Sequence, residues 1–185
     1  MFACLLLARC SDKALSPLDS SGDLDSSLLQ VRPYESKEPA GYDPQQRTPL
    51  VLLLHGYGVN GAVQKSYFGL GPLADSAGFL LAYLLAVLRD MKRRYNVDSQ
   101  RVFIVGHSNG GFMGYRLACE LSEQIAGVVS MAGAAWKDPS RCHPTTPVAI
   151  LQIHGDADDT VRYEGGPASL PLTAAYPSAH DTAAQ

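Results

Sequence analysis

The feature that most constrains this sequence is a short apolar run that leads through a glycine-rich turn directly into a helix. The run RVFIV (101–105) ends at GHSNG (106–110), and the segment 112–124 then carries apolar side chains at helical spacing. A turn this tight needs glycine on both sides, because side chains there would keep the strand and the helix apart. G-x-S-x-G in this setting predicts that Ser108 is a nucleophile held at the end of a strand. An ordinary strand–helix turn is the alternative.

Three other apolar runs predict further strands of the same sheet. PLVLLL (49–54) is continuous in its apolar character, which is typical of a strand buried on both faces of a parallel sheet. The runs 125–131 and 148–153 follow, and helical segments alternate with the strands, which predicts an α/β fold. The motifs all stand after the carboxyl ends of strands, where open α/β sheets bind their ligands.

Composition excludes several classes of function. The chain has 185 residues and a formal net charge of -3, so we expect one catalytic domain and no nucleic-acid partner. Its longest apolar stretches, 1–8 and 79–88, are shorter than the roughly 18 residues of a transmembrane helix, so we expect no membrane span. The four cysteines lack the spacing of a zinc site, and we expect neither a metal nor another cofactor.

The first 28 residues differ from the rest of the chain. MFACLLLARC resembles a degraded bacterial lipoprotein signal, although a ragged chain start is the alternative. The Ser- and Asp-rich stretch that follows is typical of a linker. We therefore expect a signal-like segment and linker over 1–28, a folded domain over 29–185, and an extracellular or cell-envelope location.

A serine nucleophile needs donors for the developing oxyanion. The backbone N–H of Asn109, at the start of the helix, is one candidate. The second is the backbone N–H of Tyr57, in the sequence HGYG (55–58) that follows the apolar strand. A flexible turn without a catalytic role is the alternative for HGYG.

The base that activates a serine is itself oriented by an acid. Asp158 follows the strand 148–153, which gives the chain order Ser then Asp that is typical of architectures with this nucleophile motif. Asp156 and Asp159 are its rivals, and a solvated or helix-capping loop is the alternative for all three.

These blocks together resemble the polyhydroxybutyrate depolymerase and feruloyl esterase branch of the α/β hydrolases. The resemblance covers PAGYDPQQRTPLVLLLHGYGVNG, RVFIVGHSNGGFMGYRLACELS and LQIHGDADDTVRYEGG. It implies an α/β-hydrolase fold, with a mostly parallel sheet flanked by helices, and an acyl-enzyme mechanism on carboxylic esters without a cofactor. It also implies Ser108 as nucleophile, Asp158 as acid, and a disulfide between Cys119 and Cys142 if the chain is exported. The substrate would be a polyester, a feruloylated polysaccharide or a small ester.

Two departures from the family pattern lead us to expect an incomplete fold. Residues 78–95 read GFLLAYLLAVLRDMKRRY without a turn signal, so we expect one inner strand to be missing. The helix and strand that precede the family's catalytic histidine are not recognisable after Asp158, so we expect the last strand to be missing too. Only His180 follows Asp158, and we expect it to be an exposed helix residue rather than the base.

The sequence therefore predicts a serine esterase that is impaired in this chain. A catalytically inactive remnant or a binding module that keeps the cleft is the main alternative. A serine peptidase or an acyltransferase would share the same triad.

Overall fold

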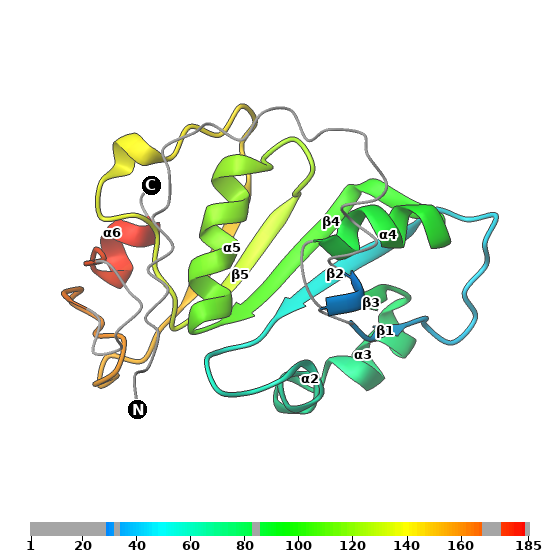
Figure 1. Ribbon diagram of the computed structural model, residues 1–185, viewed down its shortest axis with the longest axis horizontal. Helices are drawn as coiled ribbons and strands as arrows, with labels where there is room; N and C mark the ends of the chain where they lie inside the picture. Colours follow the sequence, from blue (N-terminus) through cyan, green and yellow to red (C-terminus); the bar gives the residue numbers. More distant parts are fainter. Residues whose placement is uncertain (1–28, 32–33, 83–85, 168–174, 184–185) are drawn as a thin grey trace, which may run out of the picture.

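A six-stranded sheet lies at the centre of the computed structural model, which describes residues 29–31, 34–82, 86–167 and 175–183. The strand order is β1-β3-β2-β4-β5-β6 (Figure 1). Only β1 is antiparallel to its neighbour, and the other pairs are parallel. The segment expected to be signal and linker, 1–28, lies outside the described residues.

The elements follow one another in the alternating order that the sequence predicts. The strands are β1 (Ser36–Lys37), β2 (Thr48–Leu54), β3 (Leu80–Ala82), β4 (Val97–His107), β5 (Gly127–Met131) and β6 (Ala149–Ile153). The helices are α2 (Gly61–Phe68), α3 (Leu70–Ala77), α4 (Ala86–Arg94), α5 (Asn109–Glu120), the 3-10 helix η1 (Pro139–Arg141) and α6 (Ala179–Ala183).

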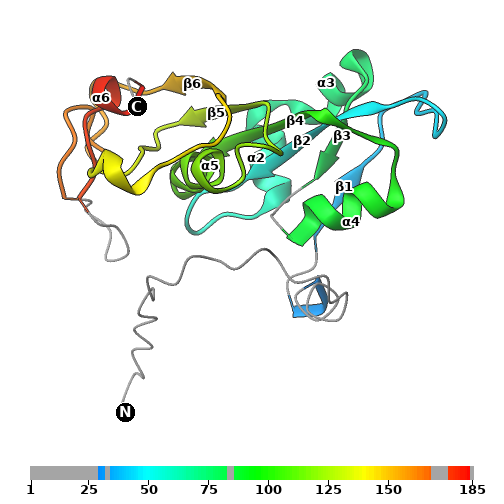
Figure 2. The same ribbon diagram turned by 90° about the horizontal axis from the view of Figure 1, so that it is seen from above.

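β2 divides the apolar core into two layers. Leu50, Leu52 and Leu54 pack with residues of α4 and α5 on one face of the sheet. Val51 and Leu53 point the other way and pack with residues of α3. Figure 2 shows this arrangement, with α4 and α5 on one side of the sheet and α3 on the other. The continuous apolar sequence of β2 thus reflects burial on both faces.

The expectation that an inner strand is missing is wrong. β3 lies between β1 and β2, and its three residues, Leu80–Ala82, are fully buried. Gly78, with φ of 68°, ends α3 in the left-handed conformation and lets the chain turn back toward the sheet. The strand has only three residues, all apolar, and no polar residue separates its sequence from that of α4. The sequence therefore carries no signal that marks β3 as a separate strand.

At the opposite edge of the sheet, β6 is only partly covered. Its register with β5 places Leu151 beside Val129, and Val129 lies beside Val105 of β4, so β6 continues the parallel part of the sheet. The side chains of Leu151 and Ile153 are 55% and 42% exposed, because the described residues cover this edge only in part. After β6 the described residues hold α6 and one isolated bridge, between Gly166 and Tyr176, but no further strand of the sheet.

The backbone at the start of α5 packs very closely against the backbone of the sheet, and two glycines make this possible. A Cβ atom on Gly106 would lie 2.2 Å from the carbonyl oxygen of Gly110. A Cβ on Gly110 would lie 2.2 Å from the carbonyl oxygen of Leu54, in β2. Both obstacles are backbone atoms, so no side-chain rotation could relieve them. These contacts fix the height of α5 above β2 and β4.

We predict that Gly110→Ala lowers the free energy of unfolding by about 3 kcal/mol, because the methyl group must push two backbone segments apart. Gly71→Ala is the matched control, since the nearest atom to its added Cβ is a flexible lysine carbon at 4.0 Å. That control should be neutral or stabilising by at most about 1 kcal/mol. Urea unfolding followed by circular dichroism measures both variants, and equal losses would contradict the steric explanation.

Candidate active site

Ser108 stands at the junction of β4 and α5 in a strained backbone conformation. Its φ of 53° and ψ of -120° are unusual for a residue with a side chain. Two hydrogen bonds hold the strain in place. The N–H of Ser108 donates to the carbonyl of Met131 at 2.8 Å, and its own carbonyl accepts from the N–H of Phe112 at 3.0 Å. This is the backbone geometry that a nucleophile elbow requires.

The loop after β2 lies directly against this serine. A Cβ on Gly56 would lie 3.4 Å from the Cβ of Ser108, which is van der Waals contact distance, so the two segments are direct neighbours. Tyr57 is the next residue of this loop, while Asn109 is the first residue of α5, where backbone N–H groups have no partner within the helix. The structure therefore brings the segments of both expected oxyanion donors to Ser108.

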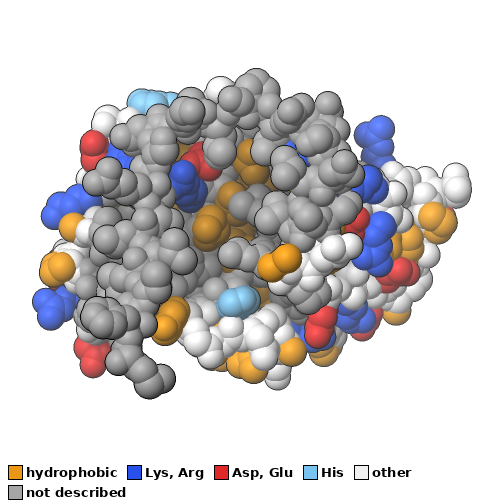
Figure 3. All heavy atoms as spheres, in the orientation of Figure 1, with side chains coloured by type: hydrophobic (Ala, Val, Ile, Leu, Met, Phe, Trp, Pro, Cys, Tyr) orange, Lys and Arg blue, Asp and Glu red, His pale blue; other side chains and the backbone are white. Residues whose placement is uncertain are grey.

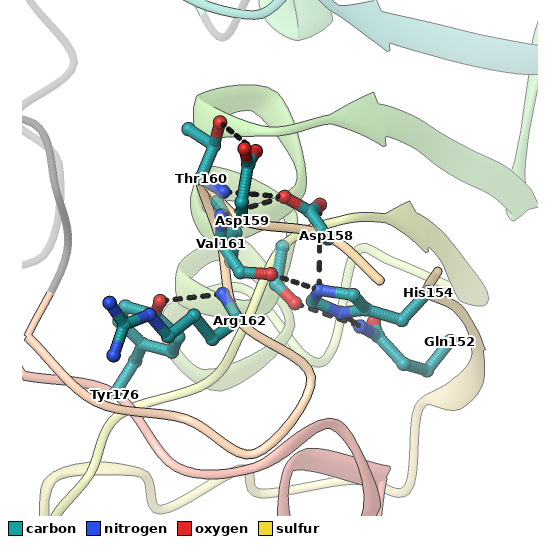
Figure 4. Close-up of polar contacts among 9 residues, drawn as sticks. Gln152, His154, Asp158, Asp159, Thr160, Val161, Arg162 and Tyr176 are labelled. Carbon is teal, nitrogen blue, oxygen red and sulfur yellow. Dashed lines mark hydrogen bonds and ion pairs between the residues drawn. The ribbon is translucent and has the colours of Figure 1, made fainter. Parts of the chain in front are cut away.

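Asp158 is the anchored member of the acidic cluster after β6. Its Oδ1 accepts the backbone N–H groups of Thr160 and Val161, each at 2.9 Å. Its Oδ2 faces the ring of His154, with 3.7 Å between Oδ2 and Nε2 (Figure 4). Asp156 and Asp159 are exposed. The local turn thus holds Asp158 by one oxygen and leaves the other without a backbone donor.

A buried polar network supports this acid loop, and sequence reasoning missed it. The side chain of His154 is 2% exposed, and its Nε2–H donates to the carbonyl of Val161 at 2.6 Å. Its Nδ1 then accepts from the amide of Gln152 at 3.0 Å. The same amide donates to the carbonyl of Gly133, and its oxygen accepts from the hydroxyl of Tyr115. Burial raises the pKa of Tyr115 to about 12, which keeps that hydroxyl a donor.

Both ring nitrogens of His154 are thereby occupied, so it is not placed to act as a base on Ser108. Within the described residues, no imidazole is hydrogen-bonded to the hydroxyl of Ser108. His180 lies in α6 with its side chain 84% exposed, which is the exposed helix position expected from the sequence. The other three histidines are His55 and His143, which are exposed, and His107, which stacks on Tyr67.

Cys119 and Cys142, the pair that the family resemblance implies, form a disulfide in the structure. The bond joins the last turn of α5 to the residue that follows η1. It therefore ties the loop between β5 and β6 to the helix that begins at the candidate nucleophile.

The described residues contain no group of three or more His, Cys, Asp or Glu side chains arranged to hold a metal ion. No helix among them has the length and apolar character needed to cross a bilayer.

Comparison with protein-family models matches residues 82–178, just over half of the chain, to the phospholipase/carboxylesterase family. The chain belongs to this family. A curated relative, the putative esterase NocK of Nocardia uniformis subsp. tsuyamanensis, is 33% identical over 159 residues, which are 70% of this chain. The probable feruloyl esterase C of Aspergillus clavatus is 27% identical over 194 residues and is matched over 71% of its own length. Both relatives of this phospholipase/carboxylesterase family member are thus named as esterases, and one of them as a feruloyl esterase.

Solved structures show the same fold. A thermostable esterase superposes with a TM-score of 0.58 at 20% identity, over 71% of this chain and 44% of that protein. Esterase PE8 superposes with a TM-score of 0.56 at 19% identity, over 69% of this chain and 76% of that protein. This family member therefore has the α/β-hydrolase fold. The chain spans about half the length of NocK, since the match covers 46% of that protein. It spans about a quarter of the bifunctional acetylxylan esterase/xylanase XynS20E of Neocallimastix patriciarum, of which 24% is matched.

We predict that replacing both disulfide cysteines (Cys119→Ser with Cys142→Ser) lowers the free energy of unfolding by about 3 kcal/mol. The bond closes a loop with a sequence separation of 23, and its loss restores conformational freedom to the unfolded chain. Urea unfolding with and without dithiothreitol tests this. The reductant should destabilise the wild type and leave the double variant unchanged, and a wild type that is insensitive to it would contradict the prediction.

Proposed function

We propose that this chain is a serine esterase that hydrolyses carboxylic esters through an acyl-enzyme at Ser108. The observation that carries the proposal is the strained backbone of Ser108, packed against the glycine loop after β2. Backbone strain of this kind persists where surrounding contacts impose it, and it concentrates at functional sites. The esterase relatives and the family match support the same chemistry.

In the proposed reaction, the Oγ of Ser108 bonds to the ester carbonyl carbon and gives its proton to a base. The carbonyl oxygen becomes an oxyanion, and the backbone N–H groups of Tyr57 and Asn109 would stabilise it. The alcohol then leaves with a proton, and water releases the acid from the acyl-serine. Asp158 would orient the base through Oδ2, since Oδ1 already accepts two backbone N–H groups.

The base is the part of the machinery that the described residues do not supply. For that reason we propose that this chain, by itself, turns over esters poorly. A binding module that keeps the cleft without catalysis is the second candidate, and the lack of an imidazole bonded to Ser108 among the described residues favours it. Asp158 would then serve only to close its own turn.

Substrate and location belong to the same proposal. Polyesters, feruloylated polysaccharides and small esters are the candidate substrates, and the name of the feruloyl esterase relative supports the second. We also propose an extracellular or cell-envelope location and the division into a leader with linker (1–28) and a hydrolase domain (29–185). The Cys119–Cys142 disulfide supports export, because such bonds persist in oxidising compartments.

We predict that a fluorophosphonate probe labels Ser108 slowly, because the oxyanion donors retain some activation of the serine when a base is lacking. Ser108→Ala should abolish the labelling. Ser76→Ala, which removes an exposed hydroxyl on α3, is the matched control and should label like the wild type. Peptide mapping by mass spectrometry locates the adduct, and equal labelling of the wild type and Ser108→Ala would refute the proposed nucleophile.

We further predict that p-nitrophenyl acetate is hydrolysed at a rate close to that of Ser108→Ala, and that His180→Ala changes nothing. In one serine protease, loss of the serine or of the histidine alone costs on the order of a millionfold in kcat, about as much as loss of all three triad members. Spectrophotometric assay of purified protein measures both rates. Ordinary esterase turnover that His180→Ala abolishes would show that His180 is the base after all.

A further inference from the structure

The helix α2 has an unusual distribution of polar and apolar side chains. Gln64 is its only buried residue, with 2% of its surface exposed. Val63 and Tyr67 are 53% and 65% exposed, and Figure 3 shows hydrophobic side chains at the surface where α2 lies in Figure 1. A surface helix normally buries its apolar side chains and leaves its amides in water. Hydrophobic packing therefore does not explain why Gln64 is buried.

The side chain of Gln64 reaches the loop that carries the proposed oxyanion donor of Tyr57. Its Oε1 accepts the backbone N–H of Gly56 at 3.4 Å, in a buried contact. This distance exceeds the usual 2.9 to 3.0 Å, as hydrogen bonds of active sites often do before substrate binds. The side chain of Asn60 caps the start of α2 by accepting the N–H of Val63 at 3.0 Å. The capped helix thus presents Gln64 to the loop.

Gly56 is the residue of this loop that most needs such support. Because it has no side chain, its backbone has more conformational freedom than that of any other residue type. Gln64 accepts its N–H, and the ring of His55 donates from Nδ1 to its carbonyl at 2.9 Å. In a planar trans peptide this carbonyl and the N–H of Tyr57 point in opposite directions. Holding Gly56 therefore also fixes the direction of the N–H of Tyr57.

The other end of the Gln64 amide shows that stability alone does not account for this residue. Its Nε2 is buried and has no hydrogen-bond partner among the described residues. A buried donor without a partner destabilises the folded state. A methionine at this position would have a similar length and no unpaired donor, but it would give Gly56 no acceptor. The acceptor oxygen is thus the feature that distinguishes Gln64 from an apolar side chain.

We propose that Gln64 is a positioning residue, whose Oε1 holds Gly56 so that the N–H of Tyr57 is in place for the oxyanion formed at Ser108. Gln64 is buried, so it acts through the loop and not through contact with the substrate. Its part in catalysis rests on the proposed esterase function, whereas its hold on Gly56 does not.

The first test removes the acceptor oxygen. Gln64→Met should slow fluorophosphonate labelling of Ser108 by about tenfold, which is less than the roughly hundredfold effect of losing an oxyanion donor itself. Gln124→Met is the matched control, because Oε1 of Gln124 accepts from Lys92 at the same distance of 3.4 Å. Gln124 precedes β5, at the opposite edge of the sheet from Ser108, so this variant should label like the wild type. Circular dichroism checks folding, and Gln64→Leu removes the same oxygen if Gln64→Met does not fold.

The second test restores an acceptor. Gln64→Glu keeps an oxygen for the N–H of Gly56, and a buried carboxyl is still largely uncharged at about pH 5.5. At that pH its labelling rate should lie within about threefold of the wild type. Its urea midpoint should be lower than that of Gln64→Met, because the carboxyl is a buried polar group and the thioether is not. The variant that labels faster is thus expected to be the less stable one, which a purely structural role would not produce.

Hydrogen exchange measured by NMR tests the hold on Gly56 without any reaction at Ser108. The Gly56 amide should exchange about tenfold faster in Gln64→Met than in the wild type, and Gln64→Glu should restore the slow rate. The Ser108 amide, which donates to Met131 at 2.8 Å, is the internal reference and should not change.

The proposal is overturned if folded Gln64→Met labels like the wild type, or if Gln64→Glu labels as slowly as Gln64→Met. Exchange of the Gly56 amide that does not respond to Gln64→Met would also overturn it. If the wild type does not label at Ser108 at all, the proposed esterase function fails and the catalytic role of Gln64 fails with it. The exchange rate of Gly56 then still decides whether Gln64 holds the loop.

Discussion

The contact between Gly106, Gly110 and the backbone of Leu54 is the constraint on which the rest of the site depends. It lets α5 start closer to the sheet than any side chain would allow. Only Ser108 then lies between the end of β4 and the start of α5, so this one residue makes the turn, and it does so with a positive φ. The strain at the candidate nucleophile is thus a consequence of helix–sheet packing, since the two glycines are what make that packing possible.

α5 also organises everything else near the site. Its first residue carries one proposed oxyanion donor. Tyr115, in its middle, reaches through Gln152 to the acid loop, and Cys119, in its last turn, holds the loop that bears Trp136. A displacement of this one helix would therefore move the nucleophile, the acid loop and the loop between β5 and β6 together.

The parts of this site that the sequence predicts are those set by local spacing. The elbow at Ser108 is recognisable because strand, glycines and helix are contiguous, and the fold class follows from the same alternation. β3 was missed because three buried residues carry no boundary signal. His154 lies in the segment LQIHGDADDTVRYEGG, which carries part of the family resemblance. Its hydrogen bonds to Gln152 and Val161 depend on the three-dimensional structure, so the sequence alone does not show them.

The two halves of the candidate site are held by different kinds of interaction. Ser108 sits over the buried centre of the sheet, where steric contacts with backbone atoms decide its position. Asp158 follows β6, the edge strand, whose Leu151 is more than half exposed, so apolar packing contributes less there. Its loop relies instead on hydrogen bonds in which His154 and Gln152 each satisfy partners on both sides. Steric contacts fail when volume is added, whereas a buried polar network fails when one partner is removed, because the others are left unsatisfied. The nucleophile should thus be sensitive to enlargement of its neighbours, and the acid to truncation of His154 or Gln152, the side chains that hold its loop.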